Sequence, residues 1–191
     1  LLGIVIVGGA LRLYHVTAPP DDFQSWRDTL GLMVARNFFR GEMNLFRPEV
    51  DWRNTIDSAQ GGVVGMTELM VTPWLTAWLY HLTGMTYWAG RVVPILFSLL
   101  GIVFFHRLAA RFQGEAHAHV AALLLTVLPY FLYCGRCQMP EAFAFCMVFA
   151  ALYWYDVWLE QGGVLRFTAA VCFAVLMLLG KPQMALHVVP M

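Results

Sequence analysis

Residues 87–106 read YWAGRVVPILFSLLGIVFFH and carry one charged side chain, Arg91. An α-helix needs about 20 mostly apolar residues to cross the roughly 30 Å of hydrocarbon in a bilayer. Residues 120–133, 138–158 and 165–180 are further apolar runs, extended by flanking residues that can reach the interface. We therefore expect four transmembrane helices in the second half of the chain.

The composition of the whole chain agrees with a membrane protein. Hydrophobic residues make up 60% of the 191 residues and charged residues 13%, whereas a soluble domain has about 25% charged residues. The net charge is zero and there is no basic block of the kind that binds nucleic acid, so we exclude a nucleic-acid partner. Residues 1–13 lack the basic start of a signal peptide and predict the tail of a first transmembrane helix. Both ends look cut, and we expect an N-terminal fragment of a longer protein.

The segment 14–86 predicts a large extracytoplasmic loop with two helices on the membrane surface. Residues 23–39 place apolar side chains such as Trp26 at helical spacings, opposite Arg27 and Asp28, which predicts an amphipathic helix. Residues 68–82 are apolar and aromatic but too short to span, so they predict an interfacial helix. The predicted fold is a single all-α domain over residues 1–191, a polytopic transmembrane bundle with juxtamembrane amphipathic helices.

The basic residues of the short loops predict the orientation. Arg107, Arg111 and Arg166 fall in connections on the same side of the predicted bundle. Cytoplasmic loops carry the excess of Lys and Arg, so this side should be cytoplasmic. The long first loop, the turn 134–139 and the region of Lys181 then share the extracytoplasmic side.

Charged residues at membrane depth are costly and mark functional sites. Residues of this kind come from separated segments and reach the extracytoplasmic face: the acids Asp22, Glu68 and Glu141, and the bases Arg27, Arg136 and Lys181. One carboxylate can act as general base, while cations or a carboxylate-held metal neutralise a phosphate leaving group. This combination predicts a catalytic site.

The acids also have structural interpretations, which stay open. Asp21 and Asp22 follow two prolines and precede a predicted helix, where Asp is an ordinary N-cap. Glu68 stands at the start of a predicted helix, where the macrodipole favours an acid.

The remaining groups have structural interpretations as well. Arg136 and Glu141 can form an interfacial ion pair, and Lys181 can snorkel at a helix end. Cys134 and Cys137 spell C-x-x-C without a βαβ pattern, which favours a helix end over redox chemistry.

The histidines show no H-E-x-x-H spacing. We interpret His117 and His119 as loop residues on the cytoplasmic side rather than as ligands.

The order of these motifs resembles a known family. Asp22-Phe23-Gln24-Ser25-Trp26-Arg27, Gly135-Arg136-Cys137-Gln138-Met139-Pro140-Glu141 and Leu179-Gly180-Lys181-Pro182 are similar to blocks of the GT-C membrane glycosyltransferases. The resemblance is to the protein-mannosyltransferase type, glycosyltransferase family 39, and to the related lipid A aminoarabinose transferase.

The resemblance implies roles for individual residues. Asp22, with Asp21 beside it, holds the place of the acid that acts on the acceptor. Glu68 matches an acid that contributes to a metal site in some relatives, so a divalent metal is the one cofactor suggested. Arg136 and Lys181 would face the lipid phosphate. Two positions depart from the pattern: Glu141 stands where relatives often carry Asp, and Leu69-Met70-Val71 replaces the usual Lys-Pro-Pro.

We therefore expect a glycosyltransferase of the bacterial inner membrane. It would move a sugar from a polyprenyl-phosphate carrier to an extracytoplasmic lipid, glycan or protein, with Asp22 and Glu141 as catalytic acids and Asp21, Arg27, Arg136 and Lys181 binding substrate. Two other classes stay open, a transporter or flippase of a lipid-linked precursor and a non-catalytic membrane scaffold. The transporter has less support because we find no inverted repeat or broken midplane helix.

Overall fold

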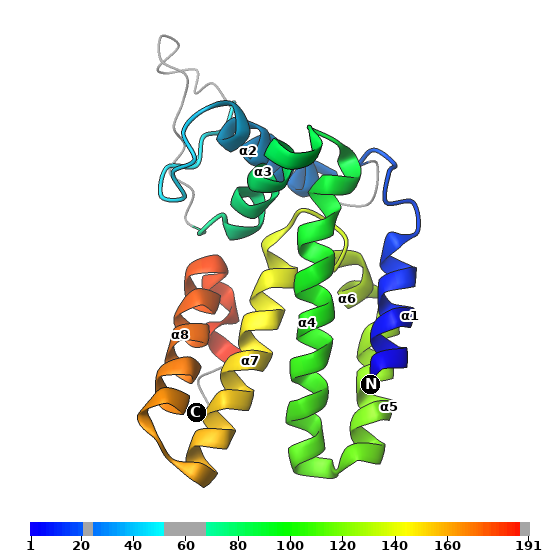
Figure 1. Ribbon diagram of the computed structural model, residues 1–191, viewed down its shortest axis with the longest axis vertical. Coiled ribbons are helices and arrows are strands. Elements are labelled where there is room, and N and C mark those ends of the chain that lie inside the picture. The colour runs from blue at the N-terminus through cyan, green and yellow to red at the C-terminus, as the bar shows by residue number, and fades with distance from the viewer. Residues whose placement is uncertain (21–24, 52–67, 188–191) are drawn as a thin grey trace.

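The computed structural model describes residues 1–20, 25–51 and 68–187, and the regular elements in these ranges are all helical. They are α1 (Leu2–Leu13), α2 (Ser25–Arg40), α3 (Val71–Thr83), α4 (Tyr87–Gln113), α5 (Glu115–Val127), α6 (Pro129–Cys134), α7 (Pro140–Gln161), α8 (Val164–Gly180) and the 3₁₀-helix η1 (Pro182–His187). The long apolar helices stand side by side, and α2 and α3 lie across one end of them (Figure 1). The all-α prediction is confirmed.

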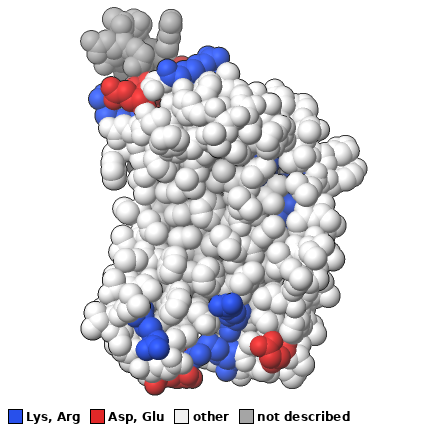
Figure 2. All heavy atoms as spheres, in the orientation of Figure 1, with Lys and Arg blue, Asp and Glu red and all other residues white. Residues whose placement is uncertain are grey.

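The surface has the pattern of a protein in a bilayer. Helices α4 and α7 are long and apolar enough to cross a membrane, and α1, α5 and α8 are shorter apolar helices. Large apolar side chains on these helices, among them Ile6, Leu124 and Leu179, are exposed. On the face drawn in Figure 2, the charged side chains gather at the two ends, and the band between them is almost free of charge. Lipid rather than water is the solvent that suits this band.

The apolar run 120–133, expected to be one helix, forms two. Helix α5 ends at Val127, and Leu128 has φ −59° and ψ 120°, outside the helical region. Pro129 explains the break, because a proline lacks an N–H donor and pushes the preceding residue toward extended dihedral angles. The short helix α6 then continues to Cys134, a buried free thiol.

The helical bundle has two chemically different ends. The C-terminal end of α4 and the N-terminal end of α8, with Arg107, Arg111 and Arg166 near them, lie at the end away from α2 and α3 (Figure 1). Lys181 follows the other end of α8, toward α2 and α3. Which end faces the cytoplasm stays a prediction.

The orientation predicted for α2 is wrong in one residue. Asp28, expected on the polar face, is 2% exposed, whereas Trp26 of the apolar face is 61% exposed, as a side chain that contacts lipid would be. Asp28 turns inward because its Oδ1 accepts a hydrogen bond of 2.6 Å from the backbone N–H of Gln138. Val34 and Phe38, from the predicted apolar face, are buried against α3.

Helix α3 begins at Val71, three residues later than Glu68, which precedes the helix instead of starting it. Met70, which replaces a residue of the usual Lys-Pro-Pro, is the N-cap and is buried in the apolar cluster between α2 and α3. The backbone N–H of Leu69 donates to the carbonyl of Leu179 at 2.7 Å. This hydrogen bond ties the segment of Glu68 to the end of α8.

Candidate functional site

Glu141 is the centre of a charged cluster at the end of the bundle that carries α2 and α3. It lies in the first turn of α7, and its side chain is 1% exposed. Arg27 of α2 approaches its Oε1 with Nη1 at 3.3 Å, and Nζ of Lys181 forms an ion pair and hydrogen bond with the same oxygen. Two cations from segments far apart in the chain therefore meet on one buried carboxylate oxygen.

The second oxygen of this carboxylate is available for a further contact. Glu141 Oε2 is buried and accepts no hydrogen bond within the part of the chain that the structure describes. Arg27 and Lys181 also keep donors, because a guanidinium has five N–H groups and an ammonium three. A buried acceptor without a donor calls for an explanation, and a ligand hydroxyl is one that fits this site.

Glu68 belongs to the same cluster. Burial raises the pKa of Glu68, the positive charges of Arg27 and Lys181 lower it, and the negative charge of Glu141 raises it again. The net shift is upward, so this carboxyl holds a proton more readily than an exposed glutamate. We call Arg27, Glu68, Glu141 and Lys181 the Glu141 cluster.

A small cavity opens beside the Glu141 cluster. It has a volume of 190 Å³, and its lining includes Arg27, Glu68, Gln138 and Pro140. The cavity therefore has a cation and an acid in its wall, contributed by different segments. A polar group that enters it would meet both.

The sequence analysis missed the contacts that hold α2 over this cavity. Gln138 donates through its backbone N–H to Asp28, and its side-chain Nε2 donates to Thr76 Oγ1 at 2.8 Å. A Cβ on Gly31 would lie 2.1 Å from the carbonyl oxygen of Gln138, so the two backbones meet at a distance only glycine allows. A glycine within an otherwise helical pattern was the one available signal.

Arg91 anchors the segment that leads to the predicted catalytic acids. Its Nη1 donates to the carbonyl of His15 at 2.8 Å, and its Nη2 donates to the carbonyl of Pro19 at 3.2 Å. Asp21 and Asp22 lie outside the described residues, so their positions stay predictions. Arg136 lies in the turn between α6 and α7, where its backbone N–H donates to the carbonyl of Tyr133 at 3.1 Å.

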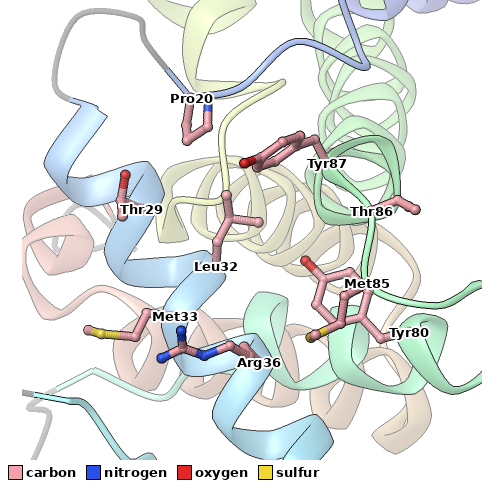
Figure 3. A pocket seen from close by; sticks show the side chains of 9 residues that line it. All are labelled: Pro20, Thr29, Leu32, Met33, Arg36, Tyr80, Met85, Thr86 and Tyr87. Atoms are coloured by element: carbon pink, nitrogen blue, oxygen red, sulfur yellow. The ribbon is translucent and has the colours of Figure 1, made fainter.

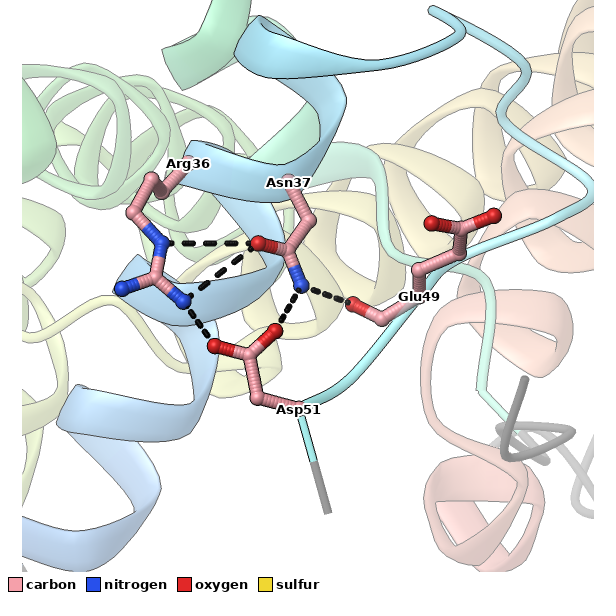
Figure 4. A network of polar contacts seen from close by, with 4 residues as sticks. All are labelled: Arg36, Asn37, Glu49 and Asp51. Atoms are coloured by element: carbon pink, nitrogen blue, oxygen red, sulfur yellow. Dashed lines mark hydrogen bonds and ion pairs between the residues drawn. The ribbon is translucent and has the colours of Figure 1, made fainter. Parts of the chain in front are cut away.

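A larger cavity, of 460 Å³, lies on another face of α2. Figure 3 shows that Arg36, Tyr80 and Tyr87 project into it from α2, α3 and α4. Arg36 also pairs with Asp51 in the loop that follows α2 (Figure 4). Asn37 supports this loop by donating to Asp51 Oδ1 at 2.8 Å and to the carbonyl of Glu49 at 3.0 Å. Helix α2 thus separates two cavities, and each has an arginine in its wall.

Comparison with known proteins gives one family. The family described as dolichyl-phosphate-mannose-protein mannosyltransferase matches residues 68–191, which is well over half of the chain. The matched range includes Glu68, Arg136, Glu141 and Lys181, and it begins after Asp22 and Arg27. No curated protein and no solved structure gives a match to the chain.

Proposed function

The chain belongs to the dolichyl-phosphate-mannose-protein mannosyltransferase family and is a membrane glycosyltransferase; we propose that its donor is a polyprenyl-phosphate sugar and its acceptor lies on the extracytoplasmic side of a bacterial inner membrane. The observation that carries the proposal is the meeting of Arg27 and Lys181 on the buried Glu141. A phosphate that leaves with negative charge is stabilised by such fixed cations.

The reaction assigns one task to each group. An acceptor hydroxyl or amine attacks the anomeric carbon, the bond from this carbon to the phosphate oxygen breaks, and the phosphate leaves with the electron pair. Arg27 and Lys181 bind the phosphate through their remaining N–H groups, and Arg136 assists them. Asp22 takes the proton of the acceptor as general base. Attack from the face opposite the phosphate inverts the configuration, and a product with retained configuration would contradict this step.

Glu141 holds the two cations at a fixed separation and offers Oε2 to a substrate hydroxyl. Glu68 is the candidate ligand for a divalent metal. Among the described residues, the Glu141 cluster does not contain a set of three metal-ligating groups close together. A metal here would therefore take further ligands from outside this cluster.

The isoprenoid chain of the donor has a suitable surface in the apolar groove between α3 and α4. The groove has a volume of 550 Å³ and a lining that is almost wholly apolar, including Leu79, Val93 and Leu96. Leu96 and Leu100 at its wall are exposed in the uncharged band. A lipid chain that lies there stays in hydrocarbon while its phosphate reaches the level of α2.

The test follows release of polyprenyl phosphate from a panel of polyprenyl-phosphate sugars by the reconstituted full-length protein. We expect turnover by the wild type on at least one donor, and a loss of about 10²-fold or more in Asp22→Asn and Lys181→Met. Glu42→Gln is the matched control, because Glu42 is an exposed acid of the same end. Turnover should be unchanged in this variant.

Three other results would contradict parts of the proposal. Equal turnover by Asp22→Asn and the wild type would leave Asp22 as a helix cap. A wild type that turns over no donor but moves a lipid-linked sugar across vesicles would be a transporter or flippase. A wild type with neither activity would support the scaffold interpretation.

A further inference from the structure

A second cluster of ionisable side chains lies at the end of the bundle away from α2 and α3. His106 comes from the last part of α4, and Glu115 and His119 come from the first part of α5. Their ligand atoms all lie within 4.8 Å of one another. We call these three residues the His106 cluster.

The turn between α4 and α5 brings the three side chains together. Gly114 is the one residue between the helices and has φ 78°, a backbone conformation that glycine adopts without strain. The two helices therefore pack side by side from the turn onward. Glu115 and His119 are four residues apart on α5 and share one face of it. His106 of α4 lies opposite this face, and the His106 and His119 rings are 4.5 Å apart between centroids.

The distances match those between the ligands of a small divalent ion. His106 Nε2 lies 3.4 Å from His119 Nδ1 and 3.5 Å from Glu115 Oε2, and His119 Nδ1 lies 3.8 Å from Glu115 Oε2. Zinc binds nitrogen and carboxylate oxygen at about 2.0–2.2 Å, which places tetrahedral ligands about 3.4 Å apart. No rearrangement of the helices is needed for one ion to reach all three atoms.

From this geometry we propose that His106, Glu115 and His119 bind a divalent transition metal, with Zn²⁺ or a similar ion as the occupant. Two imidazoles and one carboxylate are a zinc ligand set that leaves a fourth position for water. Glu115 is 74% exposed, so water and metal have access, while the 5% exposed His106 gives the site a fixed wall. For Nδ1 to bind the ion, the His119 ring turns away from the carbonyl of Glu115, 2.6 Å away, and the ring proton moves to Nε2. The ion would hold α4 and α5 together at the turn.

This interpretation revises the expectation for the histidines. His117 and His119 lie within α5 and not in a loop. His117 is exposed, and its Nδ1 contacts the carbonyl of Gln113 at 3.0 Å instead of the cluster. The spacing along the chain could not reveal the site, because His106 and His119 are brought together by the α4–α5 turn.

The test is metal binding by the purified full-length protein in detergent, and it needs no turnover. Titration with Co²⁺ should give the visible absorption of a tetrahedral site, and Zn²⁺ should abolish this absorption at one equivalent. Zn²⁺ should also raise the unfolding temperature, because it binds the folded state. In His119→Ala and Glu115→Gln, Zn²⁺ affinity should fall by about 100-fold or more. Loss of a group that only hydrogen-bonds to a metal ligand already lowers affinity by about 10–100-fold, and these variants lose a ligand itself.

Two control variants make the outcome specific. His117→Ala removes a neighbouring exposed imidazole and should bind like the wild type. Glu42→Gln removes an exposed acid at the opposite end and should also bind like the wild type. The proposal is overturned if no stoichiometric binding occurs, or if His119→Ala binds as tightly as His117→Ala. Because the His106 cluster and the Glu141 cluster lie at opposite ends of the bundle and share no residue, failure here leaves the proposed glycosyl transfer unaffected.

Discussion

The two ends of the bundle place their ion pairs in different surroundings. At one end Arg27 and Lys181 meet on Glu141, which is 1% exposed. At the other end Arg111 pairs with Asp156 and Glu160, whose side chains are 20% and 63% exposed. Exposed ion pairs stabilise a protein little, whereas a buried pair must overcome a large desolvation cost. A costly buried arrangement of this kind at the Glu141 end is what a site that binds a charged group would require.

The largest effect on turnover and stability should come from removing the charge of the central acid at each end of the bundle in turn. We expect Glu141→Gln to lower the release of polyprenyl phosphate by about 10²-fold or more. It should also lower the unfolding free energy by about 3 kcal/mol, because two cations then lack their shared partner. Asp156→Asn should leave turnover within about twofold and change the unfolding free energy by less than about 1 kcal/mol. Turnover assays and thermal unfolding of both variants in the same detergent measure the difference.

A double variant separates the two roles of Glu141. Glu141→Gln with Lys181→Met removes a buried pair together, so much of the lost stability should return. Turnover should stay low if the charges serve catalysis. Recovery of both stability and turnover would show that the charges of Glu141 and Lys181 are not needed for catalysis. The ion pairs at the two ends of the bundle would then differ only in how deeply they are buried.

The next effect concerns how tightly each part packs. Gly31→Ala places a Cβ 2.1 Å from the backbone oxygen of Gln138, whereas in Gly9→Ala the nearest side-chain atom is Leu99 Cδ1 at 3.7 Å. We expect Gly31→Ala to destabilise by about 1–3 kcal/mol despite the better helix propensity of alanine. Gly9→Ala should be neutral or slightly stabilising. Unfolding temperatures of the two variants give the sign, and a stable Gly31→Ala protein would contradict the close docking of α2.

The helical segments were largely readable from the sequence, because long apolar runs separated by turn residues specify them locally. The break at Pro129 was not predicted, although proline chemistry accounts for it. The sequence also predicted that Arg27, Glu68, Glu141 and Lys181 reach one face, and the structure brings them together. Which cation contacts Glu141 depends on packing between segments 40 and 114 residues apart, which no spacing encodes.

A similar limit applies to α2. Periodicity assigned Asp28 to the polar face of α2, and a tertiary hydrogen bond from the backbone N–H of Gln138 holds it inside instead. A hydrophobic pattern describes the average preference of a face. It does not include a buried acid whose partner is a backbone N–H in a distant turn.

A smaller effect should appear in the pH dependence of stability. The pKa of Glu68 is raised, chiefly by burial. A carboxyl with a raised pKa contributes its full stability below the pKa of the unfolded chain, about 4.3, and loses it as pH rises through the folded value. The unfolding free energy of the wild type should therefore fall by less than about 1 kcal/mol between acid and neutral pH because of Glu68. This fall should be absent in Glu68→Gln. Unfolding temperatures of this variant and of Glu42→Gln across that range provide the measurement, and identical profiles would contradict the assignment.

The smallest effect should come from the exposed network around Asp51. The hydrogen bond from Asn37, followed by the charge of Arg36, lowers the pKa of Asp51. A lowered pKa contributes stability above the unfolded value, about 3.9, and this stability is lost as pH falls through the folded value. Asn37→Ala should release residues 41–51 at a less acidic pH and change their stability by about 0.5 kcal/mol or less. Hydrogen exchange of the loop measures the release, and Asn44→Ala is the control because the Asn44 side chain accepts a hydrogen bond from the backbone N–H of Phe46 within the same loop. If exchange of the loop increases at the same pH in both variants, Asn37 does not hold the loop, and Arg36 is its anchor.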